Sequence, residues 1–139
     1  MPQSVSEMLR SDMECEGLFE CFHGLKPLDK ECFQTLVRYD QPLTIDEIAS
    51  EIDRERSTSY RSIQRLLDSG LVEKQQRNYE HGGYYHVYRP VGSDEITEEM
   101  QQMLNAWYAK MGQLLQQFED KYGAALDAPQ EPESRLESQ

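Results

Sequence analysis

Apolar residues recur at helical spacing in the segment that follows Pro27. The apolar positions are Cys32, Phe33, Leu36 and Val37. Their spacing of three and four residues places them on one face of a helix. Asp29 is the expected N-terminal cap, because a carboxylate can accept hydrogen bonds from the free amides of a first turn. We predict a first helix here, preceded by a polar segment over residues 1–16 that forms at most a short helix.

A second short helix is predicted after Pro42. Thr44 and Glu47 have the spacing of a capping box, in which each side chain accepts a hydrogen bond from the other residue's backbone amide. The buried face of this helix is expected to carry Ile45, Ile48, Ala49 and Ile52.

A third helix is predicted from near Ser57, where hydroxyl side chains can cap it, to Gly70, which can adopt a left-handed stop. Its inner stripe consists of Ile63, Leu66 and Leu67, with Ser59 one turn earlier. Arg61, Gln64 and Arg65 then fall on the opposite, exposed face.

Two strands follow, from Leu71 to Tyr79 and from Tyr84 to Arg89. Gly82 and Gly83 between them permit positive φ, so a hairpin is expected. We interpret the tyrosines of this segment as sheet packing rather than as a platform on which bases stack. They are Tyr79, Tyr84, Tyr85 and Tyr88.

A long helix is predicted over residues 93–122, which contain no proline. A heptad seam runs through Met100, Leu104, Trp107, Met111, Leu114 and Phe118. Met103, Tyr108, Leu115 and Tyr122 widen it. So broad an apolar stripe needs a cover, and we expect the same helix of a second copy. The alternative is that the stripe packs on its own domain, which would make Trp107 and Phe118 core residues.

The order of three helices and a hairpin is that of a winged helix-turn-helix. The predicted fold class is therefore mainly α with a small β-hairpin, followed by a long C-terminal dimerisation helix. We expect a polar segment over residues 1–16, the winged domain over 17–92, the dimerisation helix over 93–122 and a disordered acidic tail over 123–139.

The net charge of −12 and the pI near 4.6 speak against a polyanionic partner at first sight. The charge is unevenly distributed, however. Residues 54–91 contain seven cations and four acids, a balance of +3, whereas the rest of the chain contains seven cations and 22 acids, a balance of −15. The basic residues are concentrated where this fold would contact DNA, although arginines on a helix face can also serve only to solvate it.

We predict double-stranded promoter or operator DNA as the partner. The third helix and its entry offer cationic and hydrogen-bonding groups for phosphates and base edges. These residues are Arg54, Arg56, Ser57, Thr58, Tyr60, Arg61, Gln64 and Arg65. The hairpin, or wing, is expected to add Lys74, Arg77 and His81 at the neighbouring phosphates.

Three stretches of the chain resemble the winged-helix domain of TrmB-type archaeal transcriptional regulators. They are Ile48 with Ala49, DRERSTSYRSIQRLLDSGLVEK from Asp53 to Lys74, and GGYYHVYRP from Gly82 to Pro90. The resemblance covers roughly residues 21–122 and is most specific over residues 57–72. It is closest to short single-domain members of halophilic archaea. It implies sequence-specific DNA binding as a homodimer and control of transcription.

Two expectations follow from this resemblance. Longer members carry a C-terminal sugar-sensing domain, whereas the corresponding part of this chain is predicted to be one helix and a tail. The resemblance therefore does not imply a sugar effector for this chain. If the host cytoplasm is molar in salt, the Debye length falls to about 3 Å and repulsion from the acidic body is screened. Short-range contacts must then supply more of the affinity for DNA.

The cysteines are expected to be reduced, because three at irregular spacing do not form a secreted disulfide framework. Cys15, Cys21, His23 and Cys32 lack the C-x2-C spacing typical of structural zinc, so no metal site is expected. Cys32 is expected to be a buried small hydrophobe. Cys21 is the candidate redox thiol, with inert packing as the alternative.

No phosphate loop, H-E-x-x-H or G-x-S-x-G motif is present, so neither an enzyme nor a cofactor is expected. The polar start and the lack of a long apolar run predict a soluble, cytoplasmic protein without a membrane partner. The rival function is a winged-helix protein-interaction module in a transcription complex that does not bind DNA. The operator, the sign of regulation and the effector are left open.

Overall fold

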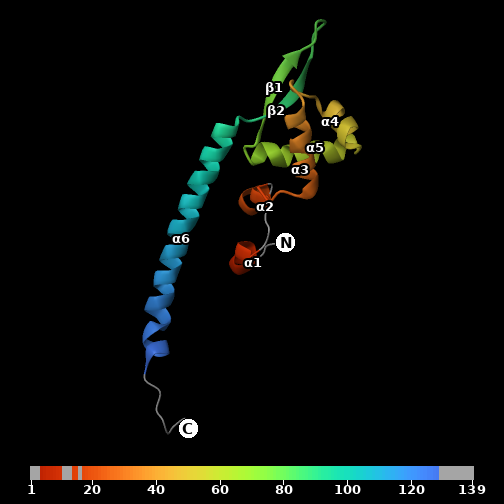
Figure 1. The fold of residues 1–139 in the computed structure, drawn as a ribbon. Coiled ribbons are helices and arrows are strands. Elements are labelled where there is room, and N and C mark those ends of the chain that lie inside the picture. The colour runs from red at the N-terminus through yellow and green to blue at the C-terminus, as the bar shows by residue number, and fades with distance from the viewer. Residues whose placement is uncertain (1–3, 11–13, 16, 129–139) are drawn as a thin grey trace. The chain divides into compact units, whose positions relative to one another are not determined.

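The computed structural model describes residues 4–10, 14–15 and 17–128. The elements in chain order (Figure 1) are α1 (Val5–Arg10), α2 (Gly17–His23), α3 (Pro27–Arg38), α4 (Ile45–Ile52), α5 (Arg56–Asp68), β1 (Val72–Asn78), β2 (Tyr84–Pro90) and α6 (Ser93–Asp127). The chain divides into two compact units, Met1–Met100 and Gln101–Gln139. Helix α6 begins in the first unit and runs into the second.

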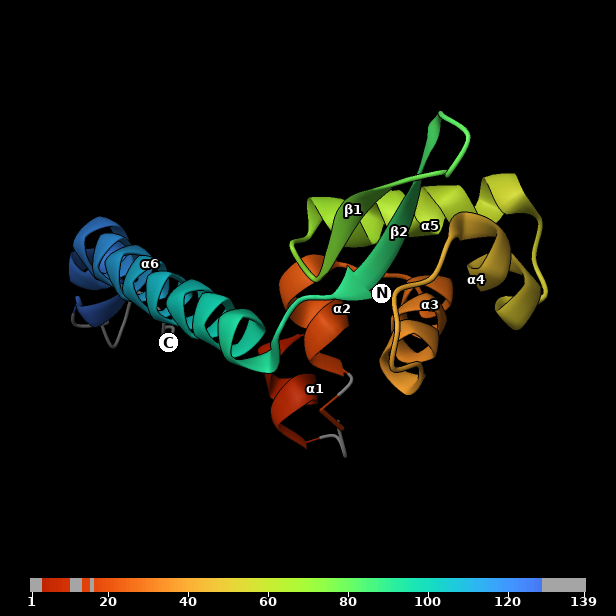
Figure 2. The same cartoon turned by 90° about the horizontal axis from the view of Figure 1, so that it is seen from above.

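Within the first unit, α3, α4 and α5 pack against one another and against the two-stranded hairpin. The tip of the hairpin projects beyond these helices in both views (Figures 1 and 2). The largest fully buried apolar side chains come from all three helices and from the residue before β1: Leu36, Ile48, Ile52, Ile63, Leu66 and Leu71. This architecture confirms the predicted winged helix-turn-helix.

The hairpin is antiparallel, with Val72 opposite Pro90 and Asn78 opposite Tyr84. The segment before α4 pairs with its second strand, because the Leu43 amide donates to the Tyr88 carbonyl at 3.0 Å and the Tyr88 amide donates back at 2.8 Å. Gly82 and Gly83 adopt φ of 101° and 81° in the turn, as predicted. The root of the wing is thus tied to the entry of α4.

The local signals of α4 and α5 are largely confirmed. The Glu47 amide donates to the Thr44 hydroxyl at 3.2 Å, and the Thr44 amide donates to the Glu47 carboxylate at 2.8 Å. Gly70 ends the α5 segment with φ of 77°. One detail was wrong: α5 begins at Arg56 behind Glu55, and no side chain caps it, so the expected hydroxyl cap near Ser57 is not formed.

Helix α3 differs from its prediction in two ways. It begins at Pro27, so Asp29 is a residue of its first turn rather than the N-cap, and its carboxylate accepts from the Lys26 amide at 3.0 Å. Val37 is 58% exposed and does not belong to the buried face. Helix α2 was not predicted; Phe19 within it packs edge to face on Phe33 of α3, with ring centroids 5.0 Å apart.

Helix α6 continues to Asp127, past the predicted end at residue 122. Gly112 and Gly123 do not interrupt it. Residues 129–139 of the predicted tail, and residues 1–3, 11–13 and 16 of the N-terminal segment, lie outside the described residues.

Candidate nucleic-acid interface

The exposed face of α5 carries the residues predicted to contact DNA. Ser59, Ser62, Ile63 and Leu66 are buried on its inner side. Helical periodicity therefore leaves Ser57, Tyr60, Arg61 and Gln64 on one outer stripe. Ser57 and Arg61 are exposed, Tyr60 is 46% exposed, and Gln64 is half-buried. Thr58 lies beside this stripe and is also half-buried.

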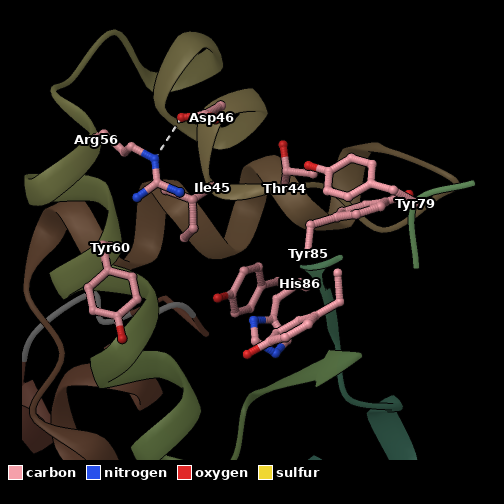
Figure 3. Close-up of a pocket in the computed structure, with 10 residues that line it drawn as sticks. Thr44, Ile45, Asp46, Arg56, Tyr60, Tyr79, Tyr85 and His86 are labelled. Carbon is pink, nitrogen blue, oxygen red and sulfur yellow. Dashed lines mark hydrogen bonds and ion pairs between the residues drawn. The ribbon is translucent and has the colours of Figure 1, made fainter. Parts of the chain in front are cut away.

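Two arginines stand at the entry of α5. Arg54 donates through Nη1 to the backbone carbonyls of Ile52 and Asp53, at 3.3 and 3.2 Å. Arg56 donates through Nε to the Asp46 carboxylate of α4 at 2.8 Å (Figure 3). Because the Arg56 and Asp46 side chains are 65% and 75% exposed, water weakens this ion pair.

Arg65 is held by a carboxylate buried within the first unit. Its Nη2 lies 2.8 Å from Oδ1 of Asp29, and its Nε lies 2.9 Å from Oδ2. The Ser62 hydroxyl donates to the same Oδ1 at 2.5 Å. The Asp29 side chain is fully buried, whereas that of Arg65 is 35% exposed. This network joins the first turn of α3 to the last turn of α5, with Asp29 and Arg65 36 residues apart in sequence.

The electrostatics of the network follow from these contacts. Burial alone would raise the pKa of Asp29, but hydrogen bonds from Arg65, Ser62 and the Lys26 amide outweigh burial and hold that pKa below its ordinary value. The hydrogen bond to Asp29 raises the pKa of Arg65 in turn. Burial raises the pKa of the neighbouring Cys32 thiol, which is fully buried as predicted. The carboxylate and guanidinium are therefore both charged at neutral pH.

The wing presents Lys74, Arg77 and His81 as exposed side chains. Lys74 and Arg77 lie on β1, and His81 lies in the turn, which is closed by a bond of 3.1 Å from the Tyr79 amide to the Gly83 carbonyl. Arg89 is bound to Glu73 on the opposite strand. The wing thus offers two cations outside ion pairs, as far as the described residues show.

A groove of about 600 Å³ lies between the wing and the starts of α4 and α5 (Figure 3). Its walls are Thr44, Ile45 and Asp46 from the start of α4, Arg56 and Tyr60 from α5, and Tyr79, Tyr84, Tyr85, His86 and Tyr88 from the hairpin. The rings of Tyr79 and Tyr85 lie 4.7 Å apart, and those of Tyr84 and His86 lie 5.6 Å apart. The expectation that these tyrosines serve only sheet packing holds for Tyr88, but Tyr79 and Tyr84 are more than half exposed.

The predicted dimerisation seam lies along α6. Leu104, Trp107, Leu114 and Phe118 are between 40% and 55% exposed. Met100, Met103 and Met111 are half-buried, and none of the helix's described side chains is fully buried. Among the flanking residues, Tyr108 and Leu115 are more than 70% exposed.

The cysteines occupy different environments. Cys15 and Cys21 are exposed, and Cys32 is buried. The thiol of Cys21 lies 3.6 Å from the sulfur of Met8 in α1. Over the described residues, no three His, Cys, Asp or Glu side chains gather in a way that could hold a metal ion. No described helix is long and apolar enough to cross a membrane.

Sequence reasoning missed Asp29 and Ser62 as anchors of α5. A signal was present, because Ser59 and Ser62 both lie on the inner side of a helix whose other inner residues are Ile63 and Leu66. A polar side chain at such a position requires a buried partner. The identity of that partner is set by tertiary packing between distant segments.

The family of sugar-specific transcriptional regulators named TrmB matches residues 19–93 of the chain. Two uncharacterised proteins of Methanocaldococcus jannaschii are also similar. One is 31% identical over 104 residues, which is 75% of this chain and 78% of that protein; the other is 26% identical over 105 residues, 76% of this chain and 86% of that protein.

Solved structures share the fold. A possible transcriptional regulator from Methanosarcina mazei is 22% identical and superposes with a TM-score of 0.69, over 77% of this chain and 90% of that one. A protein from the thermoacidophilic archaeon Sulfolobus tokodaii is 15% identical, with a TM-score of 0.57, over 69% of this chain and 93% of that one. These structures show the shared fold, and the family match over residues 19–93, more than half of the chain, shows that the chain belongs to the TrmB family of transcriptional regulators.

Proposed function

We propose that the protein binds double-stranded promoter DNA through the outer stripe of α5 and the wing. One observation carries this proposal. Among the described residues, four of the seven cations between Arg54 and Val91 form no ion pair, and all four are exposed: Arg54, Arg61, Lys74 and Arg77. In a winged helix these positions lie at the entry of the recognition helix, on it and on the wing.

The assignment of individual roles follows from the contacts. Arg61 and Gln64 are the proposed base-edge contacts, because they lie on the outer stripe of α5 and can form hydrogen bonds in the major groove. Arg54, Lys74, Arg77 and His81 are proposed to contact phosphates, with Ser57 and Thr58 near the start of α5. Arg65 receives a positioning role instead, because two of its nitrogens already bind Asp29.

Binding to DNA upstream of the protein's own gene, measured by fluorescence anisotropy, tests this proposal. Arg61→Ala should weaken specific binding by about 1–3 kcal/mol, roughly 5- to 150-fold. Arg38→Ala, which removes an exposed arginine from α3, is the matched control and should change affinity less than twofold. If neither the upstream DNA nor any DNA selected for binding is bound in preference to random DNA, the protein-interaction module becomes the better explanation.

The protein is proposed to act as a homodimer joined through α6. The exposed seam of Leu104, Trp107, Leu114 and Phe118 has heptad spacing, and a second copy could cover it. Two winged domains would then address two half-sites of a palindrome. Light scattering at micromolar concentration should give twice the chain mass, and Trp107→Ala combined with Leu114→Ala should shift the equilibrium towards monomer. A monomer in the unaltered protein contradicts this proposal.

A thiol-based response is the remaining part of the proposed function. Cys21 is exposed, so an oxidant can reach it. Hypochlorite should change the affinity for DNA of the unaltered protein and of Cys15→Ser, and it should leave the affinity of Cys21→Ser unchanged. The same response in Cys21→Ser and in the unaltered protein removes Cys21 from the mechanism.

A further inference from the structure

Three tyrosines that line the groove between the wing and the starts of α4 and α5 keep much of their surface exposed. Tyr60 is 46% exposed, Tyr79 57% and Tyr84 60%, although all three line a concave site. Figure 3 shows Tyr60 projecting from α5 on one side and the paired rings of Tyr79 and Tyr85 on the other. Exposed aromatic faces that line a hollow favour a flat ligand, which would remove them from water.

The wall of the groove contains a tyrosine whose ring is buried and whose hydroxyl has no partner among the described residues. Tyr88 is 3% exposed as a residue and lines the groove, and its hydroxyl, which forms no hydrogen bond with a described residue, is not one of the fully buried unpartnered atoms, which among the described residues are those of His23. Burial raises the pKa of this phenol, the nearby Tyr60 adds to the rise, and Arg56 opposes it. An accessible phenol hydroxyl without a protein partner can donate to an acceptor on a ligand.

The same groove holds a positive charge that a ligand could use. Arg56 binds Asp46 through Nε alone, and the rest of its guanidinium has no partner among the described residues. The pair is exposed on both sides, so an incoming carboxylate could bind the remaining nitrogens or replace Asp46 at little cost. Aromatic rings, a donor hydroxyl and a guanidinium together match one chemical class of ligand, which combines a flat ring with an anionic acceptor.

We propose that this groove binds a small planar aromatic carboxylate, whose ring lies against the tyrosines and whose carboxylate is held by Arg56 and the Tyr88 hydroxyl. Tyr60 lies on the proposed DNA-binding stripe of α5 and Arg56 stands beside it, so an occupied groove should alter the affinity for DNA. That second statement rests on the proposed function, whereas binding of the ligand itself does not.

The test is a titration of the full chain, carrying ¹³C-labelled tyrosine rings, with benzoate followed by NMR. Benzamide has the same ring without the charge, and cyclohexanecarboxylate has the charge without a planar ring. Benzoate should shift the ring signals of Tyr60, Tyr84 and Tyr88 saturably and bind at least about fivefold more tightly than either comparator. The signal of Tyr108 on α6 should stay fixed.

Two variants separate the contacts. Tyr88→Phe keeps the buried ring and removes only the hydroxyl, and should weaken benzoate about fivefold, whereas Tyr108→Phe should leave it unchanged. Arg56→Gln alters an exposed position and should weaken benzoate by a similar or larger factor, so the test stands even if Tyr88→Phe folds poorly. The proposal is overturned by unsaturable shifts, by equal binding of the three compounds, by tighter binding of a neutral sugar such as methyl glucoside, or by variants that bind as the unaltered protein does.

The link to DNA is read separately, as the affinity for promoter DNA with and without saturating benzoate. A change of more than about threefold supports the link, and no change contradicts it while the ligand site stands. If the protein binds no DNA at all, the proposed function fails, and the NMR titration still decides whether the groove is a ligand site.

Discussion

Replacing Asp29 by Asn should destabilise the first unit by about 2–3 kcal/mol. The change removes the negative charge from a fully buried carboxylate that accepts hydrogen bonds from Arg65 and Ser62 at 2.5–2.9 Å. Removing one partner of a buried ion pair costs about 3–5 kcal/mol. The value expected here is lower because the Arg65 side chain is 35% exposed and can turn towards water once released.

The assay is urea denaturation followed through the methyl signals of Ile48 and Ile63, which are buried in this unit. Urea is preferred to guanidinium because it adds no ions that screen the pair. For a unit of this size, 2–3 kcal/mol corresponds to a fall of about 10–20 °C in Tm. Asp46→Asn, which breaks the exposed pair with Arg56, is the matched control and should cost less than about 1 kcal/mol.

An Asp29→Asn cost no larger than that of the control would contradict this prediction and would mean that the network does not anchor α5. Arg65→Met should be at least as costly as Asp29→Asn, because it leaves the buried carboxylate without its cation. Combining both changes should cost less than the sum of the two, since the second change then removes no further ion pair.

Three further predictions concern stability. The pKa of Asp29 is lower in the folded protein than in the unfolded one, so the stability that this residue contributes is present above the unfolded pKa and is lost as the pH falls through the folded pKa. The difference in free energy of unfolding between the unaltered protein and Asp29→Asn should therefore be constant near neutral pH and should close in acid below about pH 4. Thr44→Ala should cost about 1 kcal/mol in urea denaturation because it removes the capping box of α4, whereas Ser57→Ala should cost less than about 0.5 kcal/mol because Ser57 caps nothing; equal costs would contradict the assigned caps. Gly70→Ala should cost about 1 kcal/mol or more, since φ is 77° and the added Cβ would lie 3.3 Å from a Glu99 carboxylate oxygen, whereas Gly92→Ala, in open space, should stay within about 0.5 kcal/mol.

The features that could be predicted from the sequence are those fixed by neighbouring residues. The capping box of Thr44 and Glu47 depends on a spacing of three, and the left-handed Gly70 depends on the lack of a Cβ. The inner stripe of Ile63 and Leu66 depends on helical period alone. These local rules were enough to place three helices and a hairpin in order, and that order defined the fold.

The features that could not be predicted depend on contacts between distant segments. Arg65 has the spacing of an exposed residue, and only the approach of α3 brings Asp29 to its guanidinium. Helix α2 has seven residues and depends on packing such as that of Phe19 on Phe33, so no local signal marked it. The aromatic groove was missed for the same reason, because the hairpin rings and Tyr60 of α5 meet only in the folded unit.

The cations of α5 and the wing are proposed to bind DNA phosphates and bases. The most direct measurement is the slope of log affinity against log salt, in a potassium chloride range over which circular dichroism is unchanged. Replacing Arg54, Lys74 and Arg77, the proposed phosphate contacts, together by alanine should reduce the magnitude of this slope by about 2.7, or about 0.9 for each phosphate that is left without its cation. Replacing Arg38, Lys110 and Lys121 by alanine changes the net charge equally and should leave the slope unchanged. Equal slopes for the two triple variants would contradict this proposal.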